Sequence, residues 1–92
     1  MSILVRFSPS GLTAEKYDEV SGRVQQGPEW PPDGLDYHCC FGDDGDLRVS
    51  EIWDSQEQFD AFGERLMPVL SEAGIEFSAE PEILPIHNIE KR

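Results

Sequence analysis

Three short segments of the chain alternate hydrophobic and polar side chains with the two-residue period of a β-strand. They cover residues 3–7, 35–41 and 47–53, and glycine, proline, serine or aspartate bounds each of them. The pattern predicts three strands whose hydrophobic faces turn toward one core. The side chains expected on that inner face are Ile3, Val5, Phe7, Leu35, Tyr37, Cys39, Phe41, Leu47, Val49, Glu51 and Trp53.

Two further segments repeat hydrophobic residues with the period of an α-helix. In the first, Thr13 is a candidate N-cap, and the apolar positions are Tyr17, Val20 and Val24. This helix is expected to end before the loop 27–34, which is rich in proline and glycine and therefore resists regular structure.

The second helix begins with a capping box, in which Ser55 is the N-cap and Gln58 stands three residues later. Pro68 removes one backbone hydrogen bond and is expected to bend the helix, and Gly74 is a candidate left-handed C-cap. One stripe collects its apolar side chains, which are Phe59, Phe62, Leu66, Leu70 and Ala73.

A last strand region is expected over residues 75–89, broken near Pro81, and Pro85 places its second half at a sheet edge. The order is then β-α-β-β-α-β. This order predicts an α+β, ferredoxin-like fold, with a four-stranded antiparallel sheet and two helices on one face. Residues 1–92 are expected to form a single domain, since chains of this length usually do.

The turn 42–46 joins two strands into a hairpin and suggests their register. The expected pairs are Phe41 with Leu47, Cys39 with Val49, Tyr37 with Glu51, and Leu35 with Trp53. The opposite sheet face then exposes Leu4, Cys40, Ile52, and either Leu84 with Ile86 or Ile83 with Ile89. An uncovered apolar face is typical of an association surface, so we expect a symmetric homodimer that stacks the two sheets.

Charge narrows the range of partners. The chain carries 19 acidic and 7 basic residues, a net charge of −12, and its basic residues are scattered. We therefore expect no nucleic-acid partner, and an anionic membrane surface would repel the chain. The longest apolar run is three residues, so no transmembrane or signal segment is expected. Adjacent Cys39 and Cys40 would point to opposite faces of a strand, which favours reduced thiols and a cytoplasmic protein.

The segment 49–62 resembles the dimeric α+β barrel superfamily, and specifically its antibiotic biosynthesis monooxygenase-like members. In those proteins the third strand ends in a tryptophan, which is Trp53 in this sequence. A serine, Ser55 here, then caps the second helix, and two phenylalanines follow three residues apart. The resemblance implies the ferredoxin-like fold, a homodimer, and a pocket between the helices and the sheet of each monomer.

Two other places extend this resemblance to small bacterial proteins of unassigned activity. One is the pair Tyr37-His38 ahead of the acidic turn, and the other is the closing segment 81–88. Together the similar segments span about residues 3–89. The superfamily includes cofactor-free oxygenases, haem-degrading enzymes, isomerases and proteins without known chemistry, so the resemblance leaves the reaction open.

Glu51 is the most unusual residue of the expected inner face, because an isolated buried carboxylate is costly. Tyr37, expected directly opposite, is a candidate donor to it; alternatively, Glu51 lies solvated at the rim of the sheet. His38 and His87 are the only imidazoles and are candidate acid–base groups. The pattern places His38 on the open dimer face and His87 on an edge strand or the surface.

A candidate ligand pocket is defined by an aromatic and aliphatic cluster, for which plain core packing is the alternative. Its members are Trp53, Phe59, Phe62 and Leu66. No histidine and cysteine spacing indicates a metal site, and the turn 43–46 lacks the spacing of a calcium loop. The sequence has no glycine-rich phosphate loop, and the expected helices carry no histidine or cysteine, so no nucleotide, flavin or haem cofactor is expected.

Three classes of function remain open. The first is a cofactor-independent monooxygenase- or isomerase-like enzyme acting on a small aromatic or polyketide-type compound, in which Glu51 takes a proton and Tyr37 stabilises the oxyanion. The second is a protein that binds a small apolar or aromatic ligand without turnover. The third is a non-catalytic dimeric module that interacts with another protein.

Overall fold

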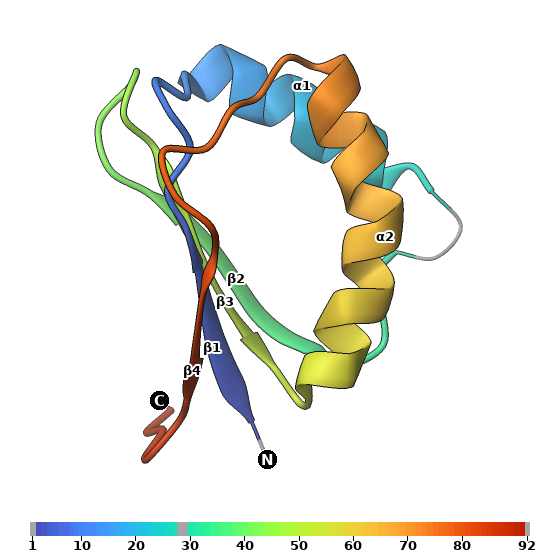
Figure 1. Ribbon diagram of the computed structural model, residues 1–92, viewed down its shortest axis with the longest axis vertical. Helices are drawn as coiled ribbons and strands as arrows, with labels where there is room; N and C mark the ends of the chain where they lie inside the picture. The colour runs from blue at the N-terminus through green and yellow to red at the C-terminus, as the bar shows by residue number, and fades with distance from the viewer. Residues whose placement is uncertain (1, 28–29, 92) are drawn as a thin grey trace.

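The computed structural model describes residues 2–27 and 30–91 (Figure 1). Its elements are β1 (Ile3–Phe7), α1 (Ala14–Gln25), β2 (Leu35–Phe41), β3 (Arg48–Trp53), α2 (Gln56–Glu72) and β4 (Glu82–Pro85). This succession confirms the β-α-β-β-α-β order that the hydrophobic pattern predicts. Residues 28 and 29 of the expected loop lie outside the described residues.

The strands form one antiparallel sheet in the order β2-β3-β1-β4. Both helices lie on the same face of this sheet, and neither helix crosses to the other face (Figure 1). The central strands β1 and β3 come from different halves of the chain, so both halves are needed to complete the sheet. This is the ferredoxin-like arrangement.

Local signals set the helix ends where the sequence predicts them. The Thr13 hydroxyl accepts from the backbone N–H of Lys16 at 3.1 Å and caps α1. The Ser55 hydroxyl accepts from the backbone N–H of Gln58 at 3.3 Å and donates to its side-chain oxygen at 3.0 Å. Gly74 follows α2 with a φ of 76°, a left-handed conformation that glycine adopts without steric cost.

The pairing of β2 with β3 departs from the expected register. The two strands pair as expected at Leu35, but an irregularity between Leu35 and Tyr37 inserts an extra residue into β2. Tyr37 therefore pairs with Ile52, and His38 takes the place opposite Glu51. The expected pairing of Tyr37 with Glu51 was wrong, because a one-residue shift turns every following side chain to the other face.

The same shift exchanges the sheet faces on which the two cysteines lie. Cys40 pairs with Val49 on the inner face and packs against the core, whereas Cys39 pairs with Ser50 on the outer face. From Cys39 to Phe41 each expected pair is displaced by one residue. Both thiols are free, and they point to opposite faces as the sequence predicts.

The hydrophobic core lies between the sheet and the two helices. Val5 and Trp53 have no exposed surface, and each such side chain contributes about 1.5–3 kcal/mol through burial. Phe62 is buried as its position in the helical stripe predicts, but Leu66 is only partly buried. The buried cluster consists of Ile3, Val5, Phe7, Val49, Trp53, Phe59 and Phe62.

The outer face of the sheet carries a row of apolar side chains, one from each strand. Leu4 pairs with Ile52 on one side and with Leu84 on the other, and Ile52 pairs with Tyr37. Tyr37 and Leu84 are 50% and 43% exposed. The expected apolar face is therefore present, but β2 contributes Tyr37 to it instead of Cys40, which lies on the inner face.

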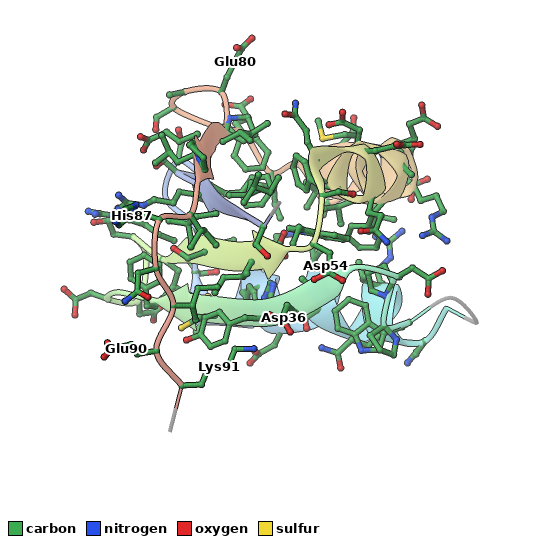
Figure 2. The ribbon with its side chains drawn as sticks, turned by 90° about the horizontal axis from the view of Figure 1, so that it is seen from below. Asp36, Asp54, Glu80, His87, Glu90 and Lys91 are labelled. Atoms are coloured by element: carbon green, nitrogen blue, oxygen red, sulfur yellow. The ribbon has the colours of Figure 1, made fainter. Side chains whose placement is uncertain are left out.

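The last strand is shorter than the sequence predicts. Only Glu82–Pro85 pairs in the sheet, and Phe77 forms an isolated bridge with Pro9. The chain then runs from the β4 edge to the opposite edge, where the Lys91 ammonium lies 3.1 Å from the carboxylate of Asp36 in β2 (Figure 2). Pro85 at the end of β4 has no N–H to donate to the ladder, and the Ile86 N–H makes one further bond to the Ser2 carbonyl at 3.2 Å.

Candidate functional site

Four polar side chains form a continuous hydrogen-bond chain on the inner side of the sheet. The Glu51 carboxylate lies at its centre: one oxygen is 2.6 Å from Nδ1 of His38, and the other accepts from the indole N–H of Trp53 at 3.0 Å. At the far end, the Tyr17 hydroxyl is 2.7 Å from Nε2 of His38. Helix α1 therefore meets β2 and β3 through Tyr17.

The register places the centre of this chain. His38 and Glu51 are cross-strand partners, so their side chains leave the same face of the sheet at neighbouring positions. Trp53 lies two residues beyond Glu51 on β3 and points to that face as well. The rings of Tyr17 and His38 stack at 6.1 Å with an angle of 21° between their planes.

The contacts fix one hydrogen position. A carboxylate only accepts, so Nδ1 of His38 carries the proton that points at Glu51. The other ring nitrogen, Nε2, faces the Tyr17 hydroxyl, which can either donate or accept. In the neutral tautomer of His38, Nε2 has the lone pair and accepts from Tyr17.

Burial differs along this hydrogen-bond chain. The Glu51 side chain is 5% exposed, and its two donors satisfy a carboxylate that would otherwise be costly in this place. The His38 side chain is 28% exposed, so it links the buried carboxylate to solvent. The alternative in which Glu51 lies solvated at the sheet rim is wrong.

The surroundings of Tyr17 keep its hydroxyl protonated. Burial raises the pKa of Tyr17 above its ordinary value of 10.0, and negative charge at Cys40 and Glu51 raises that pKa further. At neutral pH the tyrosine therefore keeps its hydroxyl proton and can donate it to a neutral His38. Cys40 faces the same side, and burial raises the pKa of its thiol as well.

An inner pocket of about 100 Å³ lies between the sheet and the helices, beside this chain, and it is partly open to solvent. Three members of the hydrogen-bond chain, Tyr17, His38 and Glu51, line it. The rest of its wall is mainly apolar, with Val20, Val24, Trp30, Phe62, Leu66 and Leu70 among its members. Polar groups in an apolar cavity are the usual composition of a small-molecule site.

The structure brings together only part of the site that the sequence predicts. Glu51 and His38 meet in the inner pocket, although His38 was expected on the open face. Tyr37 lies on the outer face with its side chain directed away from Glu51. His87 is exposed on the segment after β4 (Figure 2).

The expected pocket cluster divides in the same way. Phe62 and Leu66 line the inner pocket. Trp53 and Phe59 pack behind it instead, with their ring centroids 5.7 Å apart, and Trp53 also contacts Phe62 at 5.6 Å. Trp53 nevertheless belongs to the site through its hydrogen bond to Glu51.

Tyr17 is the functional residue that sequence reasoning did not single out. Its position in the apolar stripe of α1 predicts an inward direction, shared with Val20 and Val24. The signal available was a tyrosine at a core position, because a buried tyrosine hydroxyl usually requires a polar partner. That partner, His38, was expected on the wrong face.

The described residues also bear on metal and membrane binding. Within residues 2–27 and 30–91, no three or more histidine, cysteine, aspartate or glutamate side chains gather as a group that could hold a metal ion. No helix in that part of the chain is long and apolar enough to cross a membrane.

No protein-family model and no curated protein matches this chain. Several solved structures match it in fold. SnoaB, a cofactor-independent oxygenase from Streptomyces nogalater, superposes with a TM-score of 0.63 and 14% sequence identity over 96% of this chain and 93% of SnoaB. Rv0793 from Mycobacterium tuberculosis gives a TM-score of 0.58 and 13% identity over 98% and 95% of the two chains.

A third similar structure is a protein from Deinococcus radiodurans that is provisionally assigned as an antibiotic biosynthesis monooxygenase. It has a TM-score of 0.56 and 14% identity, and the match covers 100% of this chain and 96% of that one. At these identities the similarity concerns the fold alone. The chain thus has the ferredoxin-like α+β fold of the antibiotic biosynthesis monooxygenase-like proteins.

Proposed function

We propose that this protein is a cofactor-independent acid–base enzyme that removes a proton from a small phenol or carbon acid bound in the inner pocket. One observation carries the proposal: the chain Tyr17–His38–Glu51 lines an apolar cavity, and the carboxylate holds Nδ1 of His38 so that Nε2 faces Tyr17. An imidazole whose second nitrogen is held by a carboxylate is a common general base.

In this mechanism the substrate proton moves to the Tyr17 oxygen as the Tyr17 proton moves to Nε2 of His38. The imidazolium that forms stays hydrogen-bonded to Glu51, whose charge stabilises it. Trp53 donates to the other carboxylate oxygen and so holds Glu51 in the orientation that His38 needs. The tyrosine hydroxyl, rather than Glu51 itself, faces the substrate.

The size of the inner pocket favours a ligand with one ring. Its volume of about 100 Å³ is somewhat below the roughly 150 Å³ of an engineered cavity that holds benzene. A multi-ring polyketide exceeds that space. Once deprotonated, such a substrate is either reprotonated elsewhere, which is isomerisation, or gives electrons to dissolved O₂. The likeness to a cofactor-independent oxygenase supports the second course.

The test uses one-ring phenols and cyclic monoketones in D₂O. Hydrogen–deuterium exchange at the α-carbon of the ketones is followed by NMR, and O₂ consumption is recorded in parallel with both classes of compound. We expect His38→Gln to lower the exchange rate about 10²- to 10⁴-fold, since that is the usual contribution of a general base. His87→Gln makes the same chemical change on the exposed C-terminal segment and should leave the rate unchanged.

Two results would reject the enzyme. If compounds bind but exchange only at the buffer rate, the pocket is a binding site without turnover, and Glu51→Gln should then preserve affinity. If no compound binds at millimolar concentration, the protein is a non-catalytic module. A His87→Gln effect as large as that of His38→Gln would place the base outside the inner pocket.

We also propose a homodimer through the outer face of the sheet. The support is the apolar row from Tyr37 across Ile52 and Leu4 to Leu84, which the helices leave uncovered. Ile52→Glu places a charge in the middle of this row and should convert the dimer to a monomer of 10.4 kDa in light scattering. A native chain that is already monomeric at micromolar concentration would contradict the proposal.

A further inference from the structure

We infer that a second site, between the two helices and beside Trp30, binds a small aromatic carboxylate. A groove of about 180 Å³ runs there between α1 and α2. We call it the arginine groove, and its lining includes Arg23, Val24, Trp30, Phe62, Arg65 and Leu66. The inference goes beyond the proposed function, because it needs neither His38 nor a reaction.

Charge is the first argument for an anionic ligand. The chain has only 7 basic residues against 19 acidic ones, yet Arg23 from α1 and Arg65 from α2 both line this one groove. Guanidinium geometry matches carboxylate oxygens, so each of the two helices offers the groove a group that binds carboxylates.

Arg23 already binds a carboxylate in this position. Its guanidinium donates to Glu72 of α2 at 2.6 Å, and both side chains are largely exposed. An exposed pair of this kind is worth only about 0.2–1 kcal/mol. A ligand carboxylate that also contacts a ring surface can therefore displace Glu72 from Arg23.

The floor of the groove supplies that ring surface. Trp30 and Phe62 lie with their ring centroids 6.4 Å apart, and both line the groove. The Arg65 guanidinium lies 5.6 Å from the centre of the Phe62 ring, so charge and aromatic surface meet at one point. This arrangement suits a flat ring that bears a carboxylate at its edge.

The arginine groove is separate from the proton-transfer chain but adjacent to it. Four residues, Val24, Trp30, Phe62 and Leu66, line both the groove and the inner pocket. None of Tyr17, His38 and Glu51 lines the groove. Binding in the groove is therefore measurable without activity, by signals from Val69, which lines the groove and not the inner pocket.

The experiment titrates the full chain with 2-naphthoate and with 2-naphthamide, its neutral counterpart. Binding is followed by calorimetry and by the methyl signals of Val69 in NMR spectra. We expect the carboxylate to bind about tenfold more tightly than the amide, since hydrogen bonds to charged groups stabilise more than neutral ones. The double variant Arg23→Gln, Arg65→Gln should remove that preference.

A matched control removes two positive charges elsewhere. Lys16→Gln with Arg48→Gln makes the same change in net charge at residues that line neither cavity, and should keep the tenfold preference. Glu72→Gln should act in the opposite direction and strengthen naphthoate binding about 1.4- to 5-fold, because it frees Arg23. A variant that merely misfolds cannot produce this gain.

Several outcomes would overturn the inference. Equal affinity for naphthoate and naphthamide, or no binding of either, would show that the arginines select no carboxylate. A control double variant that loses as much affinity would reduce the effect to overall charge. Naphthoate-dependent shifts at the His38 ring but not at the Val69 methyl groups would move the ligand to the inner pocket.

Discussion

The layer between the sheet and the helices has two halves that differ in packing. Around Trp53 the layer is filled: Trp53 has no exposed surface and contacts Phe59 and Phe62 ring to ring. Beside α1 the layer is hollow, and about 100 Å³ remains between Tyr17 and the sheet. Close packing supplies most of the stability in such a domain, so the hollow half is the half available for binding.

The hydrogen-bond chain connects the two halves. Trp53 belongs to the filled half, Tyr17 to the hollow half, and Glu51 lies between them with one oxygen toward each. A buried charge is retained at this boundary because both neighbours supply donors. The filled half therefore holds Glu51 in a fixed orientation, and through His38 the carboxylate acts on the groups that line the hollow half.

Breaking the filled half should have the largest effect on stability. Phe59→Ala removes a buried ring packed against Phe7 and Trp53, and should lower the free energy of unfolding by about 3–5 kcal/mol in urea denaturation. Phe62→Ala should cost less, because its ring already borders the inner pocket. A Phe59→Ala loss below about 1 kcal/mol would contradict the division into two halves.

Breaking the boundary should have an intermediate effect. Glu51→Ala leaves the buried indole N–H of Trp53 without its acceptor, which should cost about 1–3 kcal/mol in the same measurement. Glu51→Gln keeps one acceptor oxygen and should cost less. Glu64→Ala, on the exposed side of α2, is the control and should remain within about 0.5 kcal/mol of the parent. Equal losses for the two alanine variants would count against a buried role for Glu51.

Filling the hollow half should sharpen the contrast by acting in the opposite direction. Val24→Leu adds a methylene that points into the inner pocket, and should raise the free energy of unfolding by about 0.5–1 kcal/mol. The same change should weaken binding of one-ring ligands, because it occupies their space. A destabilised Val24→Leu protein would mean that the pocket is already as full as the core.

The smallest effect concerns alkaline pH. The pKa of Tyr17 in the folded state lies above 10.0, its ordinary value, because of burial first and of the nearby negative charges second. The corresponding stability is complete below about pH 10 and is lost as the pH rises through the folded pKa. Tyr17→Phe should therefore flatten the alkaline decline in unfolding free energy. An unchanged decline in Tyr17→Phe would show that Tyr17 is solvated.

Much of the fold follows from local patterns in the sequence. The alternation in residues 3–7 and 35–41 predicts β1 and β2 with their observed bounds, and Ser55 and Gly74 mark the two ends of α2. Each of these features depends on neighbours within a few residues. The inward position of Glu51 also follows from alternation within one strand.

The composition of the site was decided by tertiary structure. The extra residue between Leu35 and Tyr37 selects which neighbour, Tyr37 or His38, faces Glu51, and a period of two cannot reveal where a bulge falls. The sequence determined that a carboxylate would lie on the inner face of this sheet. Only the docking of α1 brought Tyr17 to a histidine 21 residues away, because that contact depends on how a helix packs across the strands.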